Sequence, residues 1–311
     1  MKNRIVLSTL LTLLLTTSCS SKNESIKVIC PTGAPAVAFY NHFNDENFET
    51  NGVPSNIVSF MNEQSPYQIV VIDTVSGIKA INNGAPYRIH SSITFGNFFI
   101  ASTGHDDNGV MDPTDKIVLF SQKQTPDLLF HYIFGNEFDS AIEYVTAVSD
   151  AAGCLASGKN ALTKSDVDYV FIAQPALFAT LNNKEAPTYG KSGVYANIQD
   201  LYKSKSNNKS LVQASVFVKN NTKNCDKYLA TLESDINSVI SDPSKITTTL
   251  GEFDADQVKT KYGIAPNAMK AVIANNNSLG LGFKKASENK EDINNFISIF
   301  GLGAIDDKII A

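Results

Sequence analysis

One pattern recurs along this chain and constrains its fold more than any other feature. A short apolar run ends in a polar turn, and a segment of helical character follows, often opened by proline. The pattern appears at "VICPTGAP", "YQIVVIDTVSG", "KIVLFSQKQTP" and "VDYVFIAQP". Proline in the first helical turn costs no hydrogen bond and fixes φ, so each proline is a credible helix start. Strands that alternate with helices predict βαβ units, mostly parallel sheets and an α/β fold.

The chain length and the grouping of these units predict two lobes. The chain has 311 residues, which is more than a single hydrophobic core usually serves. We expect residues 26–103 and 217–311 to form the first lobe, and residues 104–216 to form a second lobe inserted into it. The chain would cross between the lobes near residues 102–112 and 213–218. The C-terminal tail has a helical pattern and would close the first lobe.

Charge and cysteine usage exclude several classes of protein. The formal net charge is −5, and nothing in the sequence suggests the basic face that nucleic-acid binding needs. Cys30, Cys154 and Cys225 are far apart, so we interpret them as small buried hydrophobic residues. A disulfide between Cys30 and Cys154 stays an open alternative. No histidine lies near a cysteine at zinc-ligand spacing, so we predict no metal site and no cofactor.

The N-terminus has the order of a secretory signal. A basic "MKNR" precedes the apolar "IVLSTLLTLLLTT", and the small and polar "SCSSKNES" follows. The stretch "LTTSC" resembles the lipobox of bacterial lipoproteins. The resemblance implies that residues 1–19 are a signal peptide, that lipidated Cys19 anchors the protein outside the bacterial cell membrane, and that residues 20–25 are a tether. An ordinary signal peptide with an incidental cysteine is the alternative.

Taken in order, several stretches resemble one family. They are "VICPTGAPAVAFY", "VVIDTVSGIKAINNG", "IVLFSQKQTPDLLFHYIFG", "AVSDAAGCLASGK", "YVFIAQPALFATL" and "ASVFVKNN". Together they are similar to substrate-binding lipoproteins of ABC importers with the type II periplasmic-binding fold, in the branch of nitrate, sulfonate, taurine and thiamine-precursor binders. The resemblance implies two α/β lobes, each a mostly parallel sheet flanked by helices, with a ligand cleft between them. It also implies a monomer that binds a small molecule and an ABC transporter permease.

The resemblance places the ligand at turns that follow strands. Helix N-termini carry unpaired N–H groups, glycine allows close approach, and open α/β sheets bind ligands at the carboxyl ends of their strands. The implied ligand-binding residues are Thr32, Gly33, Ala34, Asp73, Thr74, Val75, Thr94, Asn97, Gln122, Gln124, Thr125 and Gln174. The chain departs from the branch because it has no tryptophan and has Gln174-Pro175 where Glu-Pro is common.

The sequence favours a binding protein over an enzyme. It contains no G-x-S-x-G, H-E-x-x-H, Walker or G-x-G-x-x-G motif, so we predict no catalytic residues. Two alternatives stay open: a secreted enzyme on the same fold, with Asp73 as its candidate carboxylate, and a surface lipoprotein with no role in transport. Lys123 is the only basic residue in the implied loops, which favours a mono-anion or a neutral polar solute over phosphate or sulfate.

Overall fold

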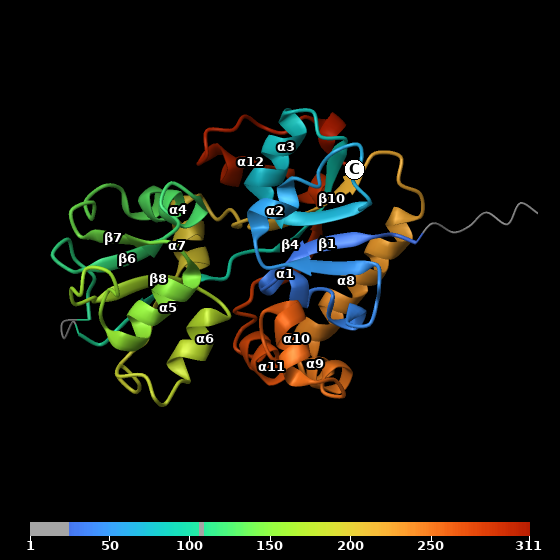
Figure 1. Ribbon diagram of the computed structural model, residues 1–311. Helices are drawn as coiled ribbons and strands as arrows, with labels where there is room; N and C mark the ends of the chain where they lie inside the picture. Colours follow the sequence, from blue (N-terminus) through green and yellow to red (C-terminus); the bar gives the residue numbers. More distant parts are fainter. Residues whose placement is uncertain (1–24, 106–108) are drawn as a thin grey trace, which may run out of the picture.

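The computed structural model describes residues 25–105 and 109–311, and it shows two lobes side by side (Figure 1). Cys19 and the predicted signal peptide lie outside these residues, so the lipobox stays a prediction. Within the described ranges, none of the helices combines the length and the apolar character that a membrane crossing requires.

The first lobe is built on a mixed sheet with the strand order β11-β4-β10-β3-β1-β2 in the described chain. Strand β1 pairs in parallel with β2 and β3, whereas β10 pairs antiparallel with β3 and β4, and β11 pairs antiparallel with β4. The bounds are β1 (Val28–Pro31), β2 (Phe48–Asn51), β3 (Ile69–Asp73), β4 (Tyr87–Thr94), β10 (Ala214–Lys219) and β11 (Leu281–Lys285).

Helices cover both faces of this sheet, because successive strand residues point to opposite faces. Val28 and Cys30 pack into one buried cluster, and Ile29 between them packs into the other. The C-terminal helices confirm the predicted helical tail. The helices of this lobe are α1 (Ala34–Val37), η1 (Tyr40–His42), α2 (Pro54–Val58), α3 (Thr74–Asn82), α8 (Cys225–Ser241), α9 (Ser244–Leu250), α10 (Ala255–Tyr262), α11 (Pro266–Ala274), α12 (Ala286–Ser298) and η2 (Asp307–Ile309).

The second lobe has its own sheet, with the strand order β7-β6-β8-β5-β9 among the described residues. Strand β6 pairs in parallel with β7 and β8, and β5 pairs antiparallel with β8 and β9. The strands are β5 (Phe98–Ser102), β6 (Ile117–Phe120), β7 (Ile142–Val145), β8 (Tyr169–Ala173) and β9 (Gly193–Asn197). The helices are α4 (Thr125–Phe134), α5 (Val148–Ser157), α6 (Ala176–Leu181) and α7 (Ile198–Lys205). The two-lobed α/β fold is therefore confirmed.

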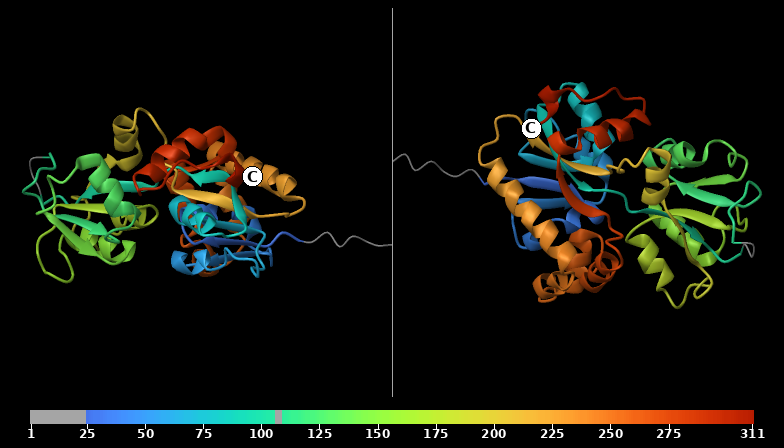
Figure 2. Two further views of the ribbon diagram at one scale, coloured as in Figure 1. Left: turned by 90° about the horizontal axis from the view of Figure 1, so that it is seen from above. Right: turned by 180° about the vertical axis from the view of Figure 1, so that it is seen from behind.

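The chain crosses between the lobes earlier than the sequence indicated (Figure 2). The first crossing lies between β4 and β5, at residues 95–97, and the return lies between α7 and β10, at residues 206–213. The predicted boundary at residue 103 is wrong, because β5 already pairs in the second sheet. The boundary at residue 216 would cut through β10 of the first sheet. Both β5 and β10 enter a sheet directly from the other lobe and pair antiparallel to its parallel strands.

The three described cysteines agree with their interpretation as buried hydrophobic residues. Cys30, Cys154 and Cys225 are buried and free. Cys30 belongs to β1 in the first lobe and Cys154 to α5 in the second, so the open alternative of a disulfide between them is wrong. In the ranges 25–105 and 109–311, no group of three or more His, Cys, Asp or Glu residues is placed to hold a metal ion.

Candidate functional site at the lobe junction

The turns that follow β3 and β6 meet across the lobe junction. Asp73 ends β3, and its Oδ1 accepts the Ser76 amide 2.8 Å away, which caps helix α3. Its Oδ2 accepts the hydroxyl of Thr125, the first residue of α4, at 3.4 Å. Burial raises the pKa of Asp73, while hydrogen bonds from Ser76 and Thr125 and the charge of Lys79 act in the opposite direction. The structure thus brings together turns that are 52 residues apart in the sequence.

The side chains of the two residues after Asp73 are buried instead. The Thr74 hydroxyl makes a 2.8 Å hydrogen bond with the Ser215 hydroxyl, and both side chains are fully buried. Val75 packs in the hydrophobic core. Of this predicted trio, Asp73 has a side chain that accepts a hydrogen bond from the other lobe.

Two buried oxygens at the first crossover, one at the end of β4 and one directly before β5, have no hydrogen-bond partner in the described structure: Thr94 Oγ1 and Asn97 Oδ1. Thr94 ends β4 and Asn97 precedes β5, and their exposed fractions are 1% and 5%. Asn97 Nδ2 donates to the Gln174 carbonyl at 2.8 Å, and the Asn97 amide donates to Gln213 Oε1 at 3.2 Å. A buried polar atom left unpaired costs about 1–3 kcal/mol. These two oxygens are therefore strong candidates to contact a ligand.

Gln174 extends this network back to the first lobe. Its Nε2 donates to the Ser278 hydroxyl at 3.4 Å, and its Oε1 accepts the Phe178 amide at 3.1 Å. Gln174 and Asn97 are among the predicted ligand-binding residues, whereas Gln213 and Ser278 are not. Gln213 directly precedes strand β10, and this position at a strand end could have indicated it from the sequence. Ser278 comes close to Gln174 only when the chain folds.

The second-lobe turn before α4 presents exposed amide side chains. Gln122 and Gln124 are exposed, and Lys123 between them is exposed too. The backbone N–H of Lys123 donates to Asp127 Oδ2 at 2.6 Å. Ser121 and Lys123 both have positive φ, 58° and 61°, so this turn depends on its hydrogen bonds to keep its shape.

The first-lobe turn before α1 is built differently. Gly33 has φ 99°, a conformation that favours glycine, and its N–H donates to the Tyr262 carbonyl at 2.8 Å. Thr32 is half-buried and Ala34 is buried. Helix α1 is only four residues long, shorter than the predicted helical run. The turn is therefore tied to helix α10, and the Gly33 N–H already has a partner.

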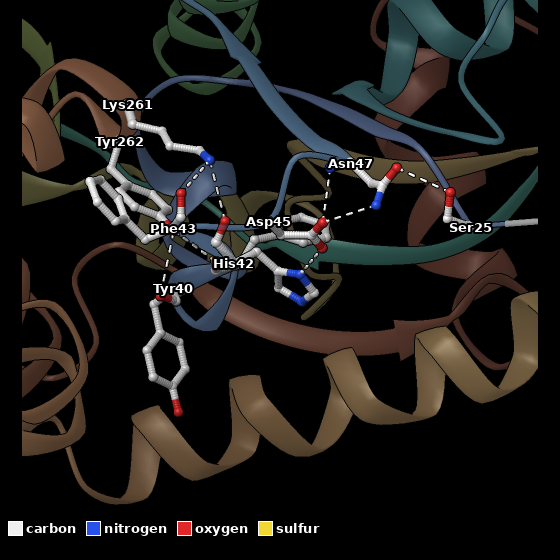
Figure 3. Close-up of polar contacts among 9 residues, drawn as sticks. Ser25, Tyr40, His42, Phe43, Asp45, Asn47, Lys261 and Tyr262 are labelled. Carbon is white, nitrogen blue, oxygen red and sulfur yellow. Dashed lines mark hydrogen bonds and ion pairs between the residues drawn. The ribbon is translucent and has the colours of Figure 1, made fainter.

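Two surface cavities lie elsewhere on the first lobe, with volumes of about 740 and 460 Å³. Lys261 lines the larger cavity, and its ammonium donates to the carbonyls of His42 and Phe43 at 3.3 and 2.7 Å (Figure 3). The same ammonium lies over the rings of Phe43 and Phe48. Asp45 lines the smaller cavity and pairs with His42 at 3.0 Å. Because these charges already have partners, the cavities are weaker candidates than the lobe junction.

Comparison with known proteins bears on the fold. No family model and no curated protein matches the chain. Among solved structures, an ABC transporter protein from Parabacteroides distasonis has a TM-score of 0.70 at 15% identity, covering 92% of this chain and 98% of that one. The periplasmic aliphatic sulphonate binding protein SsuA from Escherichia coli has a TM-score of 0.57 at 11% identity, covering 92% and 91%.

This chain has the fold of these binding proteins. The alkanesulfonate-binding protein SsuA from Xanthomonas axonopodis pv. citri, solved with bound MOPS, also shares it, with a TM-score of 0.55 at 11% identity over 89% of this chain and 92% of that one. The predicted resemblance to the sulfonate-binding branch is confirmed at the level of the fold. At these identities, ligand and site residues must be argued from this chain itself.

Proposed function

We propose that this protein is an extracytoplasmic solute-binding lipoprotein that captures a small solute between its lobes and delivers it to an ABC transporter permease. The observation that carries the proposal is the pair of unpaired buried oxygens, Thr94 Oγ1 and Asn97 Oδ1, on a crossover between two lobes. A solute that donates hydrogen bonds to them would remove their cost of burial. The shared fold with ABC-importer binding proteins supports the same reading.

The charges near the junction narrow the solute class. Asp73 contributes a carboxylate there, and Lys123 is the only basic side chain in the second-lobe turn. A multiply charged anion would have little to balance it beside Asp73, since like charges at close range repel. A mono-anion, such as a small sulfonate, or a neutral polar compound fits better. In either case a donor group on the solute would face Thr94 and Asn97.

We further propose that binding occurs without chemical turnover and that the protein acts as a monomer. Both carboxylate oxygens of Asp73 already accept hydrogen bonds, one from the Ser76 amide and one from the Thr125 hydroxyl. We therefore assign this side chain a structural role. A compound bound at the junction should be recovered unchanged after long incubation. Conversion to a product would instead support the enzyme alternative, and Asp73→Asn would then be the first variant to assay.

The anchor is proposed to be lipidated Cys19, ahead of the described residues. A diacylated N-terminal cysteine binds a membrane far more firmly than a single chain does. Expression of the full chain and of Cys19→Ala in a bacterium, followed by mass spectrometry and membrane partitioning, tests this point. The wild type should carry the lipid mass and stay with the membrane, whereas equal release of both proteins would contradict it.

Solute binding itself is tested by a thermal-shift screen. Sulfonates including MOPS and taurine, nitrate, phosphate, sulfate, pyrimidines, flavins and amino acids form the panel. A ligand that binds only the native state raises the melting temperature in proportion to the logarithm of its concentration over Kd. We expect a hit among mono-anions or neutral polar compounds. Stabilisation by phosphate or sulfate alone, with none by the rest of the panel, would contradict the proposed solute class.

A further inference from the structure

His131 on helix α4 lies between two carboxylates, outside the residues that the sequence singled out. Its Nδ1 is 3.0 Å from Asp127 Oδ1 and 2.8 Å from the Asp127 carbonyl oxygen, and its Nε2 is 3.0 Å from Asp139 Oδ1. Carbonyl and ionised carboxylate oxygens only accept hydrogen bonds. Both ring nitrogens must therefore donate, which the imidazolium form does. A neutral ring would turn one lone pair toward an acceptor.

Asp127 connects this histidine to the second-lobe turn. Its Oδ2 accepts the Lys123 N–H at 2.6 Å, and its Oδ1 accepts the Tyr144 hydroxyl at 2.8 Å. The Asp127 side chain is buried, so both of these bonds are at least partly shielded from water. Ser121 and Lys123 have positive φ, a conformation that costs free energy for residues other than glycine. The Asp127 carboxylate is therefore a contact that holds the turn in this shape.

The charged groups around His131 favour its proton. Burial acts to lower its pKa, but hydrogen bonds and charges from Asp127 and Asp139 outweigh burial and raise the pKa above the ordinary 6.5. Asp127 lies on the same helix, Asp139 lies in the loop before β7, and Tyr144 of β7 lies behind Asp127. Helix α7, which also packs on α4, meets it through the rings of Tyr202 and Tyr132.

We propose that His131 is a positioning residue: its proton, acting through Asp127, holds the Ser121–Gln124 turn in the shape that forms one wall of the solute site. The solute part of this statement rests on the proposed function, whereas the link from His131 to the turn does not. Because the pKa of His131 is raised in the folded state, the stabilisation of the turn by the protonated ring is fully present below the ordinary pKa of histidine. This stabilisation is lost as the pH rises through the raised pKa of His131.

The direct test is nuclear magnetic resonance on the solute-free protein. We expect both ring nitrogens of His131 to carry protons at pH 6.5, with a titration midpoint above that of a free histidine. The Lys123 amide, corrected for intrinsic exchange, should be protected at pH 6 and lose protection above the midpoint. A neutral His131 ring at pH 6 would overturn the proposal.

Variants separate a positioning role from a merely structural one. His131→Gln should lower Lys123 amide protection at least tenfold at pH 6. Asp139→Asn, which changes an exposed partner and keeps Asp127, should fold normally and move the His131 midpoint downward. His42→Gln is the matched control, because His42 pairs with Asp45 in the first lobe at the same 3.0 Å distance. Unchanged Lys123 protection in His131→Gln, or an equal loss in the control, would overturn the link.

Solute affinity tests the part of the proposal that concerns the solute site. A compound identified by the thermal-shift screen should bind His131→Gln at least fivefold more weakly at pH 6, and the difference should vanish above the His131 midpoint. Equal affinity for the two proteins at pH 6 would overturn this part of the proposal. The exchange measurements need no solute, so failure to find any binder would count against the proposed function and leave the link from His131 to the turn intact.

Discussion

The two turns that precede helices α1 and α4, "CPTGAP" and "SQKQTP", share the pattern of a strand, a turn and a proline, yet they are held in different ways. In the first lobe, the Gly33 N–H bonds to the Tyr262 carbonyl of helix α10, and glycine itself supplies the positive φ. In the second lobe, Ser121 and Lys123 adopt positive φ without glycine, and Asp127 holds the Lys123 N–H. The first turn is held by a backbone bond to helix α10. The second is held by backbone bonds of Ser121 and Gln124 and, in addition, by the buried carboxylate of Asp127. The same strand–turn–proline pattern can therefore give turns that different hydrogen bonds hold in shape.

The largest effect should come from removing the support of the second turn. Asp127→Ala deletes the acceptor of the Lys123 N–H, the Tyr144 hydroxyl and the His131 ring. Hydrogen bonds to a charged group contribute about 1.5–3 kcal/mol each, and bonds within one network are not additive, so we expect the free energy of unfolding to fall by at least about 3 kcal/mol. Chemical denaturation measures this change. Asp139→Ala, whose carboxylate is 57% exposed, is the control and should cost well under half as much; equal costs would contradict a special role for Asp127.

A smaller loss is expected from the first turn. Gly33→Val places a β-branched residue at φ 99°, although a Cβ at this position would meet no atom within 4 Å. The cost is therefore backbone strain of about 1–3 kcal/mol and not a clash. Lys123→Gly in the second turn should be neutral or slightly stabilising by the same logic, since glycine adopts its φ of 61° readily. Denaturant midpoints for the pair check the comparison, and destabilisation by Lys123→Gly would break it.

The sequence was sufficient for the general architecture of these lobes. Apolar runs such as Val28–Pro31 and Ile69–Asp73 are buried strands, and Pro126 lies in the first turn of α4, as the pattern predicts. The C-terminal helices follow their apolar periodicity too. These features depend on neighbours close in the sequence, which is why local patterns are enough to predict them.

The crossovers and the site depend on contacts that no local pattern contains. The predicted boundary left residues 95–103 in the first lobe, and only pairing shows that β5 belongs to the other sheet. The strand β11 was missed because "LGFKK" has few apolar residues, and it forms by pairing with β4. The bond from Gly33 to Tyr262 joins residues far apart in the chain. His131 is not among the residues that the sequence singles out, because its two carboxylate partners come together with it only on folding.

The smallest effect concerns the contact that joins the two regions. Thr125→Val removes the hydroxyl that donates to Asp73 Oδ2 at 3.4 Å. The bond is long, so the loss should lie near the lower end of 0.5–1.5 kcal/mol, at about 0.5 kcal/mol. Removing this donor should also raise the pKa of Asp73 further, since the bond favours the charged carboxylate. A carboxyl titration followed by carbon-13 resonance checks this, and an unchanged Asp73 midpoint would mean that the turns do not interact in solution.

The central claim is that a solute binds at the lobe junction and pairs with the unpartnered oxygens there. Isothermal titration of the screened solute into wild type, Thr94→Val and Ser91→Ala tests it most directly. Both substitutions remove a buried hydroxyl that lacks a partner, on the same strand β4, so neither should destabilise the free protein. The account predicts a five- to tenfold weaker Kd for Thr94→Val and an unchanged Kd for Ser91→Ala, since a neutral hydrogen bond contributes about 1 kcal/mol. Equal affinities for all three proteins would contradict it.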